Sequence, residues 1–190
     1  MERNIPTQRI ETAKPHSEWA DRLFKQAWGE PRNILTPDKL LADCQGGAHP
    51  QDKLVEGWRF FRELHNVLLS IGGYETCFPL IEEDMPALLE RGRYYPGRSK
   101  LMKGQDCKCH ANACGIWLAN KDDKDVSIAT GYALSTDGLW RQHSWVIHRY
   151  RTRTQNRVRL VETTVKRIAY FGFELTEEES EAFCYNNDIY

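Results

Sequence analysis

Three short segments of the chain carry side chains that could perform covalent chemistry together. Cys109 stands where a helix is expected to begin, His143 lies in a predicted strand, and Glu162 lies in the next predicted strand. A thiol is a useful nucleophile only as its thiolate, which requires a base within reach and a group that holds this base in place. The three residue types therefore predict a nucleophile, a general base and an orienting acid.

The position of Cys109 favours an activated thiol. The residues before it are loop-like and those after it are apolar, so a helix is expected to begin there. Thiols at helix N-termini have lowered pKa values, because the unsatisfied amides and the helix dipole favour the anion. Ala113 and Trp117 follow one and two helical turns after Cys109, so the three side chains are expected on one buried face of the helix. A cysteine without partners is more often a small core residue, and Cys107 is a competing thiol.

His143 and Glu162 are expected to meet across two strands. Alternation places His143 on one strand face with Trp145 and Ile147. Glu162 shares a face with Leu160, and a glutamate that points into a core is costly unless it is paired or hydrogen-bonded. An imidazolium beside Glu162 would remove that cost. A histidine on an apolar face is, taken alone, more often a satisfied core residue.

A specific register follows if His143 and Glu162 stand directly opposite each other. In an antiparallel hairpin, the sequence positions of any two opposite residues add up to the same number, which the turn sets. We therefore expect the turn near 151–154, with Tyr150 opposite Gln155 and Trp145 opposite Leu160. A shift by one residue would send Glu162 to the other face.

The same motifs resemble the transglutaminase-like branch of the papain-like cysteine enzymes. The matching segments, in the order of that superfamily, are Cys109-His-Ala-Asn-Ala113, Gly131-Tyr132, His143-Ser-Trp-Val146 and Val161-Glu-Thr-Thr164. The resemblance covers roughly residues 100–165, and the acid here is glutamate where aspartate is usual. It implies acyl transfer at an amide or ester through a thioester, which ends in water or in an amine.

The resemblance also implies a role for each residue. Cys109 would be the nucleophile, His143 the general base and then acid, and Glu162 the orienter of the imidazole. The backbone N–H of Cys109 and the side chain of Gln105 are the expected oxyanion donors. The acyl groove would be lined by the aromatic side chains of Tyr132, Trp140 and Trp145, although large aromatics on strands are more often core than cleft.

The elements that must position these residues change character along the chain. The first half reads as helical and the second half as a sheet rich in β-branched and aromatic residues. The expected helices begin at Ser17 and Pro37, span 51–69, run between Asp84 and Gly92, begin at Cys109, and open at a Thr176–Glu179 capping box; the expected strands are 126–135, 139–151, 158–165 and 168–173.

This order predicts an α+β fold in which the cysteine-led helix packs on an antiparallel sheet. With 190 residues, 41% of them hydrophobic, the chain is long enough for one domain with a sizeable core. We expect residues 1–190 to form that domain, with an extended arm at 1–16, a helical part at 17–98 and the cysteine helix, sheet and terminal helix at 99–190.

Composition limits the classes of partner. The net charge of −1 provides no global field for nucleic acid or anionic membranes. No stretch approaches the ~20 apolar residues of a membrane span, and the N-terminus has no apolar signal core, so a cytoplasmic location is the default expectation. A peptide, protein or small amide substrate is expected, with no cofactor, and the oligomeric state stays open.

Two further observations have less specific interpretations, and one alternative function stays open. The arginines at alternate positions 149–159 are interpreted as a solvated hairpin, with an acidic substrate as the minor alternative. Cys107, Cys109, His110 and Cys114 could form a zinc module, but their spacing is too tight for paired zinc knuckles, so no metal is expected. A binding protein that keeps the fold without the chemistry is the main alternative function.

Overall fold

The computed structural model describes residues 4–14, 51–77 and 84–187, and within the first helix the side chains from Arg59 onward. The elements follow in the order α3 (Gln51–Ile71), β1 (Glu75–Thr76), α4 (Met85–Arg91), β2 (Arg93–Pro96), β3 (Ser99–Leu101), α5 (Cys109–Ala119), β4 (Val126–Leu134), β5 (Leu139–Arg151), β6 (Asn156–Glu162), β7 (Ala169–Glu174) and α6 (Glu177–Asn186). The fold is mixed α+β, as the sequence predicts.

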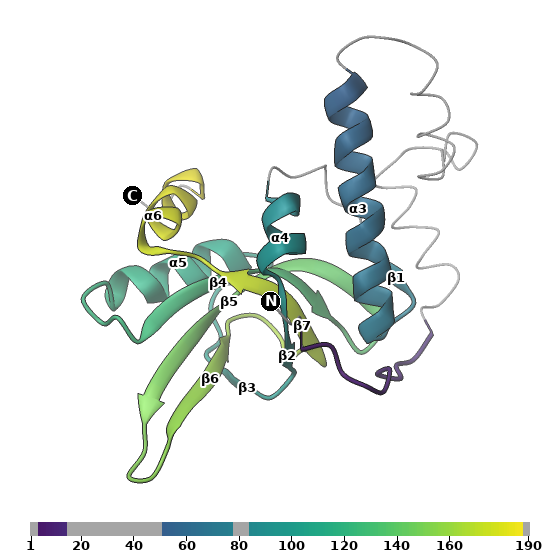
Figure 1. Cartoon of the computed structure of the whole chain (residues 1–190). Helices are drawn as coiled ribbons and strands as arrows, with labels where there is room; N and C mark the ends of the chain where they lie inside the picture. The colour runs from purple at the N-terminus through teal and green to yellow at the C-terminus, as the bar shows by residue number, and fades with distance from the viewer. Residues whose placement is uncertain (1–3, 15–50, 78–83, 188–190) are drawn as a thin grey trace.

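One curled sheet forms the centre of the fold, in the strand order β2-β7-β4-β5-β6-β3, with β1 beside β5. The helices lie over one side of it (Figure 1). Most pairings are antiparallel, but β1 pairs with β5 and β3 pairs with β6 in parallel. The predicted antiparallel sheet is therefore confirmed for most pairings and corrected for these two. The short strands β1 and β2 also lie in the part predicted to be helical.

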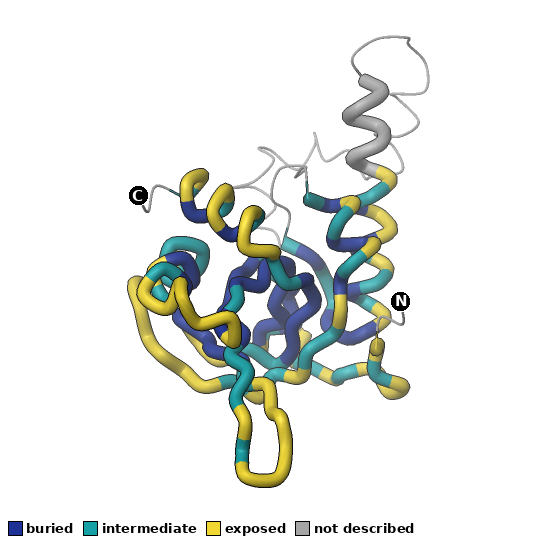
Figure 2. Tube along the Cα trace, turned by 60° about the vertical axis from the view of Figure 1, so that its left-hand side comes forward, coloured by how far each residue is buried: buried dark blue, intermediate teal, exposed yellow. Residues whose placement is uncertain are grey.

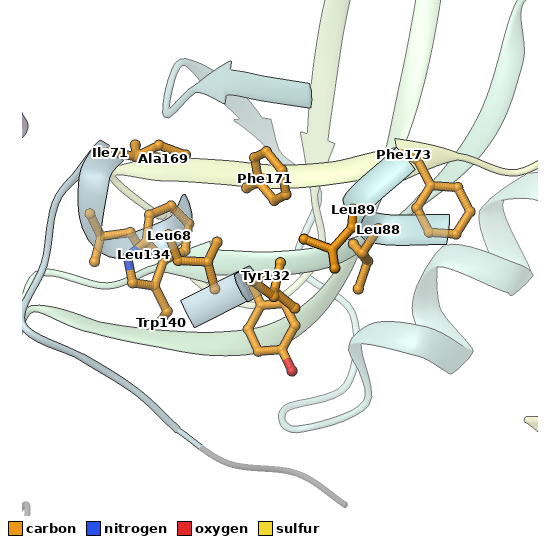
Figure 3. Packing of buried hydrophobic residues seen from close by; sticks show 11 residues of the cluster. Leu68, Ile71, Leu88, Leu89, Tyr132, Leu134, Trp140, Ala169, Phe171 and Phe173 are labelled. Atoms are coloured by element: carbon orange, nitrogen blue, oxygen red, sulfur yellow. The ribbon is translucent and has the colours of Figure 1, made fainter. Parts of the chain in front are cut away.

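The helix-covered face of the sheet holds the largest apolar cluster (Figure 3). Side chains at alternate positions of β4 and β7, with one side chain of β5, meet Leu64, Leu68 and Ile71 of α3 and Leu88 of α4. Burying one such side chain contributes about 1.5–3 kcal/mol. The strand residues of this cluster include Tyr132, Leu134, Trp140 and Phe171.

The opposite face carries a second cluster, centred on Trp145 of β5 and Tyr170 of β7, whose ring centroids are 4.9 Å apart. Glycines give these large rings room. A Cβ atom built on Gly172 would lie 2.6 Å from the Trp145 ring. Gly131 pairs with His143 in the β4–β5 ladder and with Gly172 in the β4–β7 ladder, and a Cβ atom built on Gly131 would lie 2.2 Å from the Phe171 carbonyl oxygen, so the close approach of β4 and β7 requires glycine there.

The cysteine-led helix α5 begins at Cys109, where it was predicted, and packs on β5 and β4. The terminal helix α6 packs on α5, with buried Cys114 and Cys184 in one cluster between them. Thr176 and Glu179 form the predicted capping box. These contacts hold the start of α5 against the middle of β5.

The predicted segments of the first half have different outcomes. The helix predicted at 51–69 extends to Ile71, and the one between Asp84 and Gly92 spans Met85–Arg91. The helices predicted from Ser17 and Pro37 lie outside the described residues. Within the predicted arm, the Ile10 N–H donates to the Ile71 carbonyl at 2.8 Å, so this part of the arm is attached to the end of α3. In the described part of the chain, no helix has the length and apolar character needed to cross a membrane.

The register between β5 and β6 differs from the prediction by two residues. Tyr150 pairs with Arg157 instead of Gln155, and Ile147 takes the place opposite Leu160 that was predicted for Trp145. The cause is the turn at 152–155, where the Thr152 N–H and hydroxyl both donate to the Gln155 carbonyl at 2.8 Å. A shift by two preserves the alternation, so Glu162 still lies on the face of His143.

Candidate active site

The site lies in a gap along the outer edge of β5. The β5–β6 ladder ends at Val146 paired with Val161, and among the described residues β1 pairs with Leu139 and Trp140 of β5 alone. Between these two pairings, the Ser144 N–H donates to the sulfur of Cys109. The thiol therefore takes a hydrogen bond that a neighbouring strand would otherwise accept.

His143 connects the thiol to a buried carboxylate. Its side chain is hydrogen-bonded to the Cys109 thiol. Its Nε2 lies 3.0 and 2.9 Å from the two carboxylate oxygens of Glu162. With Nε2 engaged by Glu162, the other ring nitrogen is left for the sulfur. The structure thus brings together the three residues predicted as nucleophile, base and orienting acid.

Glu162 is fully buried, and its carboxylate is saturated with donors. The backbone N–H groups of Thr163 and Thr164 donate to Oε1 at 2.8 Å each. The Tyr170 hydroxyl donates to Oε2 at 2.9 Å. Burial alone would raise the pKa of Glu162, but the bond and charge of His143, the backbone donors and Tyr170 lower it to about 2. Glu162 is consequently an anion at neutral pH.

The thiol and the imidazole shift each other's pKa in opposite directions. Burial disfavours the Cys109 thiolate, but the hydrogen bond and charge of His143, with the N–H groups of Ser144 and His110, lower the thiol pKa below its usual value. Burial likewise disfavours a charged His143, but its bonds to Cys109 and Glu162 raise the imidazole pKa. Both shifts favour a thiolate–imidazolium pair.

His110 attaches the start of α5 to β5. Its Nδ1 lies 2.7 Å from the Ser144 hydroxyl, which donates to the Thr130 hydroxyl at 3.0 Å. The His110 ring also packs edge-on against Phe183 of α6. Burial and the charge of His143 lower the His110 pKa, which keeps this second imidazole neutral. The sequence pattern does not indicate His110 or Ser144 as members of the triad site, although each adjoins a predicted triad residue.

The loop before α5 is tied to the end of β6. The N–H groups of Met102 and Gly104 donate to the carbonyls of Glu162 and Thr163, each at 2.8 Å. The backbone of Gln105, the predicted oxyanion donor, is held at both its N–H and its carbonyl by the Asn112 side chain. Gln105 itself is exposed. The N-cap residue of α5, Lys108, makes no capping hydrogen bond with its side chain, so it does not occupy the first N–H groups of the helix.

The aromatic residues predicted to line a groove are buried. Trp140 lies in the core against α3, where its indole N–H donates to the Gly72 carbonyl at 2.8 Å. Tyr132 is in the same cluster, and Trp145 packs against Tyr170 behind His143. The exposed fraction is 1% for Tyr132 and zero for the two tryptophans. The structure therefore places all three in the core, where they support the site but offer no surface to a substrate.

The cysteines of the alternative zinc module are dispersed. Cys107 is exposed, Cys109 faces His143, and Cys114 is buried and hydrogen-bonded to Cys184. Across the described residues, no three histidine, cysteine, aspartate or glutamate side chains are grouped so as to hold a metal ion.

No protein family model, curated protein or solved structure matches the chain.

Proposed function

We propose that the chain is a cysteine-dependent acyl-transfer enzyme, an amide or ester hydrolase or a transferase to amines, with a transglutaminase-like or papain-like arrangement of its site. The single observation that carries the proposal is the hydrogen-bonded series from Cys109 through His143 to the buried Glu162. A buried anion with this many fixed donors holds the imidazole in one orientation. The expected substrate is a peptide, a protein or a small amide.

In the proposed reaction, the Cys109 thiolate attacks the substrate carbonyl carbon. The N–H of Cys109, at the start of α5, and Gln105 are the proposed donors to the resulting oxyanion. His143 gives its proton to the departing amine or alcohol, which leaves a thioester on Cys109. Water or an amine then loses a proton to His143, attacks the thioester and releases the acid or the new amide with the thiol restored.

Alkylation by iodoacetamide at neutral pH, with the modified cysteine mapped by mass spectrometry, tests the activated thiol. We expect Cys109 to react roughly tenfold or more faster than an unperturbed thiol, since only the thiolate is nucleophilic. Cys109→Ala should abolish the fast phase, and the matched variant Cys107→Ala should retain it. A fast phase that survives in Cys109→Ala and disappears in Cys107→Ala would transfer the role to Cys107.

Acylation by an activated aryl ester tests the chemistry itself. An enzyme should gain the mass of the acyl group on Cys109 and lose it with time as water or an added amine accepts the group. Cys109→Ala and His143→Ala should release no product above background. A stable acyl adduct without turnover, together with slow alkylation, would favour the alternative of a binding protein that keeps the fold without the chemistry.

A further inference from the structure

A basic recess lies on the outer edge of the β5–β6 hairpin, and Cys109 is not among the residues that line it. The hairpin projects from the body of the molecule (Figure 1), and its far end is exposed (Figure 2). The recess has a volume of about 410 Å³. Its lining residues are Arg98, Ser99, Lys100, Tyr150, Arg157, Val158 and Arg159.

The positive charge of this recess is not neutralised within the described residues. Four of the seven lining side chains are cationic and none is acidic. No ion pair joins Arg98, Lys100, Arg157 or Arg159 to a carboxylate of the described chain, whereas Arg149 on the same hairpin pairs with Glu174. The whole chain has a net charge of −1, so this concentration of cations is local. An anionic partner is the chemistry that it fits.

The recess also contains an open strand edge. β3 pairs with β6 only from Leu160 to Glu162, so within the described residues the outer edge of β6 has no partner strand from Asn156 to Arg159. Arg157 and Val158 point to opposite faces of the sheet, yet both line the recess. The recess therefore lies on the edge itself, where backbone N–H and C=O groups are available.

The side chains of β6 and its open edge together limit which ligand would fit. Arg157 and Arg159 are two residues apart and project from the same face, and the Arg159 guanidinium stacks on the Tyr150 ring at 4.6 Å. Val158, between them, is 61% exposed. Backbone pairing with an edge strand requires an extended polypeptide, and cations at every second position match acidic side chains at every second position. A nucleic acid would satisfy the charges but leave the edge unpaired.

We propose that the outer edge of β6, with Arg98, Lys100, Arg157 and Arg159, binds an extended polypeptide that carries acidic side chains at alternate positions and adds to the sheet as a strand. This surface does not include the thiol. Binding is therefore measured in Cys109→Ala, so that its result and the result of the acylation test are independent.

The probe is a fluorescein-labelled peptide in which glutamate alternates with valine, followed by fluorescence anisotropy. We expect saturable binding that weakens with added salt, and about tenfold or more weaker binding when glutamine replaces glutamate. Methylation of alternate backbone nitrogens should weaken binding by a similar factor, because it removes donors to the strand edge. Equal binding of the glutamine peptide, or of the methylated peptide, would overturn the proposal.

Matched charge reversals separate the recess from the general charge of the hairpin. Arg157→Glu with Arg159→Glu should reduce binding about tenfold or more, whereas Arg151→Glu with Arg153→Glu, the same change of charge outside the recess, should reduce it only a few-fold. Thermal unfolding of both variants checks the fold. Equal losses in the two variants, or tighter binding of a single-stranded oligonucleotide than of the acidic peptide, would refute the peptide assignment.

Discussion

Two histidines belong to the surroundings of Cys109: the His143 ring is hydrogen-bonded to the thiol, whereas His110 contributes its backbone N–H to the thiol and its ring to Ser144. The pKa values of the two imidazoles are shifted in opposite directions. His143 gains the carboxylate of Glu162 and its pKa is raised despite burial, whereas burial and the charge of His143 lower the pKa of His110. Two titratable groups whose pKa values differ in this way can take different roles at one pH. The arrangement favours His143 as the proton carrier and His110 as a neutral attachment between α5 and β5.

Glu162→Gln should lower the reactivity of Cys109 without removing the thiol. An amide carries no charge, so the pKa of His143 should fall, and the thiolate loses part of the cation that stabilises it. We expect the rate of iodoacetamide alkylation at neutral pH to fall by roughly 10- to 100-fold, with the midpoint of its pH profile moved upward.

Tyr170→Phe is the matched control for that experiment. It removes one donor to Glu162 and keeps the carboxylate, so it should cost about 1 kcal/mol of stability and change the alkylation rate much less than Glu162→Gln does. Equal rates in wild type and Glu162→Gln would show that Glu162 is a structural anion only.

At the scale of elements, alternation and register carry different information. A period of two places His143 and Glu162 on one face, and this part of the prediction is confirmed by their hydrogen bonds. Register depends on the turn, and the turn closed by Thr152 and Gln155 shifts the pairing by two residues. Nothing in the strand pattern itself specifies that turn, so the sequence predicts the contact but not the cross-strand neighbour.

Other elements were missed for related physical reasons. The strands β1 and β3 contain two and three residues, too few to show a period, and both pair in parallel with strands distant in sequence. Tyr170 was not recognised as a donor to Glu162, because its place beside the carboxylate depends on how β7 pairs with β4. The two threonines after Glu162 were visible in the sequence and supply its backbone donors.

The attachment of α5 to β5 gives a prediction at the same scale. Ser144→Ala removes the hydroxyl between His110 and Thr130 but keeps the Ser144 N–H that donates to the sulfur. We expect a loss of about 1–2 kcal/mol in the free energy of unfolding, because two buried groups lose a partner. The midpoint of the alkylation profile should move little, since the direct donor remains.

Urea unfolding and the pH profile of alkylation measure these two effects. The control is Ser127→Ala on β4. The Ser127 hydroxyl lies 3.3 Å from the Glu174 carboxylate and takes no part in the contacts of the thiol, so this variant should leave the alkylation profile unchanged. Wild-type stability in Ser144→Ala would show that the contact between His110 and Ser144 does not hold the two elements together.

At the scale of the whole molecule, the charges separate into two kinds of environment. The buried anion of Glu162 is enclosed by donors from β5, β7 and its own strand end, and it contributes to stability. The cations of the basic recess lie on an exposed hairpin and have no carboxylate partner in the described chain, so they are available for binding. The folded core therefore depends on pH through the first kind, and recognition depends on salt through the second.

The pH dependence of global stability follows from Glu162. Its pKa is about 2 in the folded protein against an ordinary value of 4.5, so the unfolded chain takes up the proton first as the pH falls. The stabilisation is fully present above pH 4.5 and is lost as the pH falls toward 2. The expected loss is on the order of 3 kcal/mol, which urea unfolding across a pH series measures.

Glu162→Gln cannot titrate, so its stability should be lower at neutral pH but should decline less in acid. Glu181→Gln, which removes an exposed carboxylate paired with Lys121 at 2.6 Å, should keep the steeper wild-type decline. Parallel declines in wild type and Glu162→Gln would mean that Glu162 does not carry the acid sensitivity of the fold.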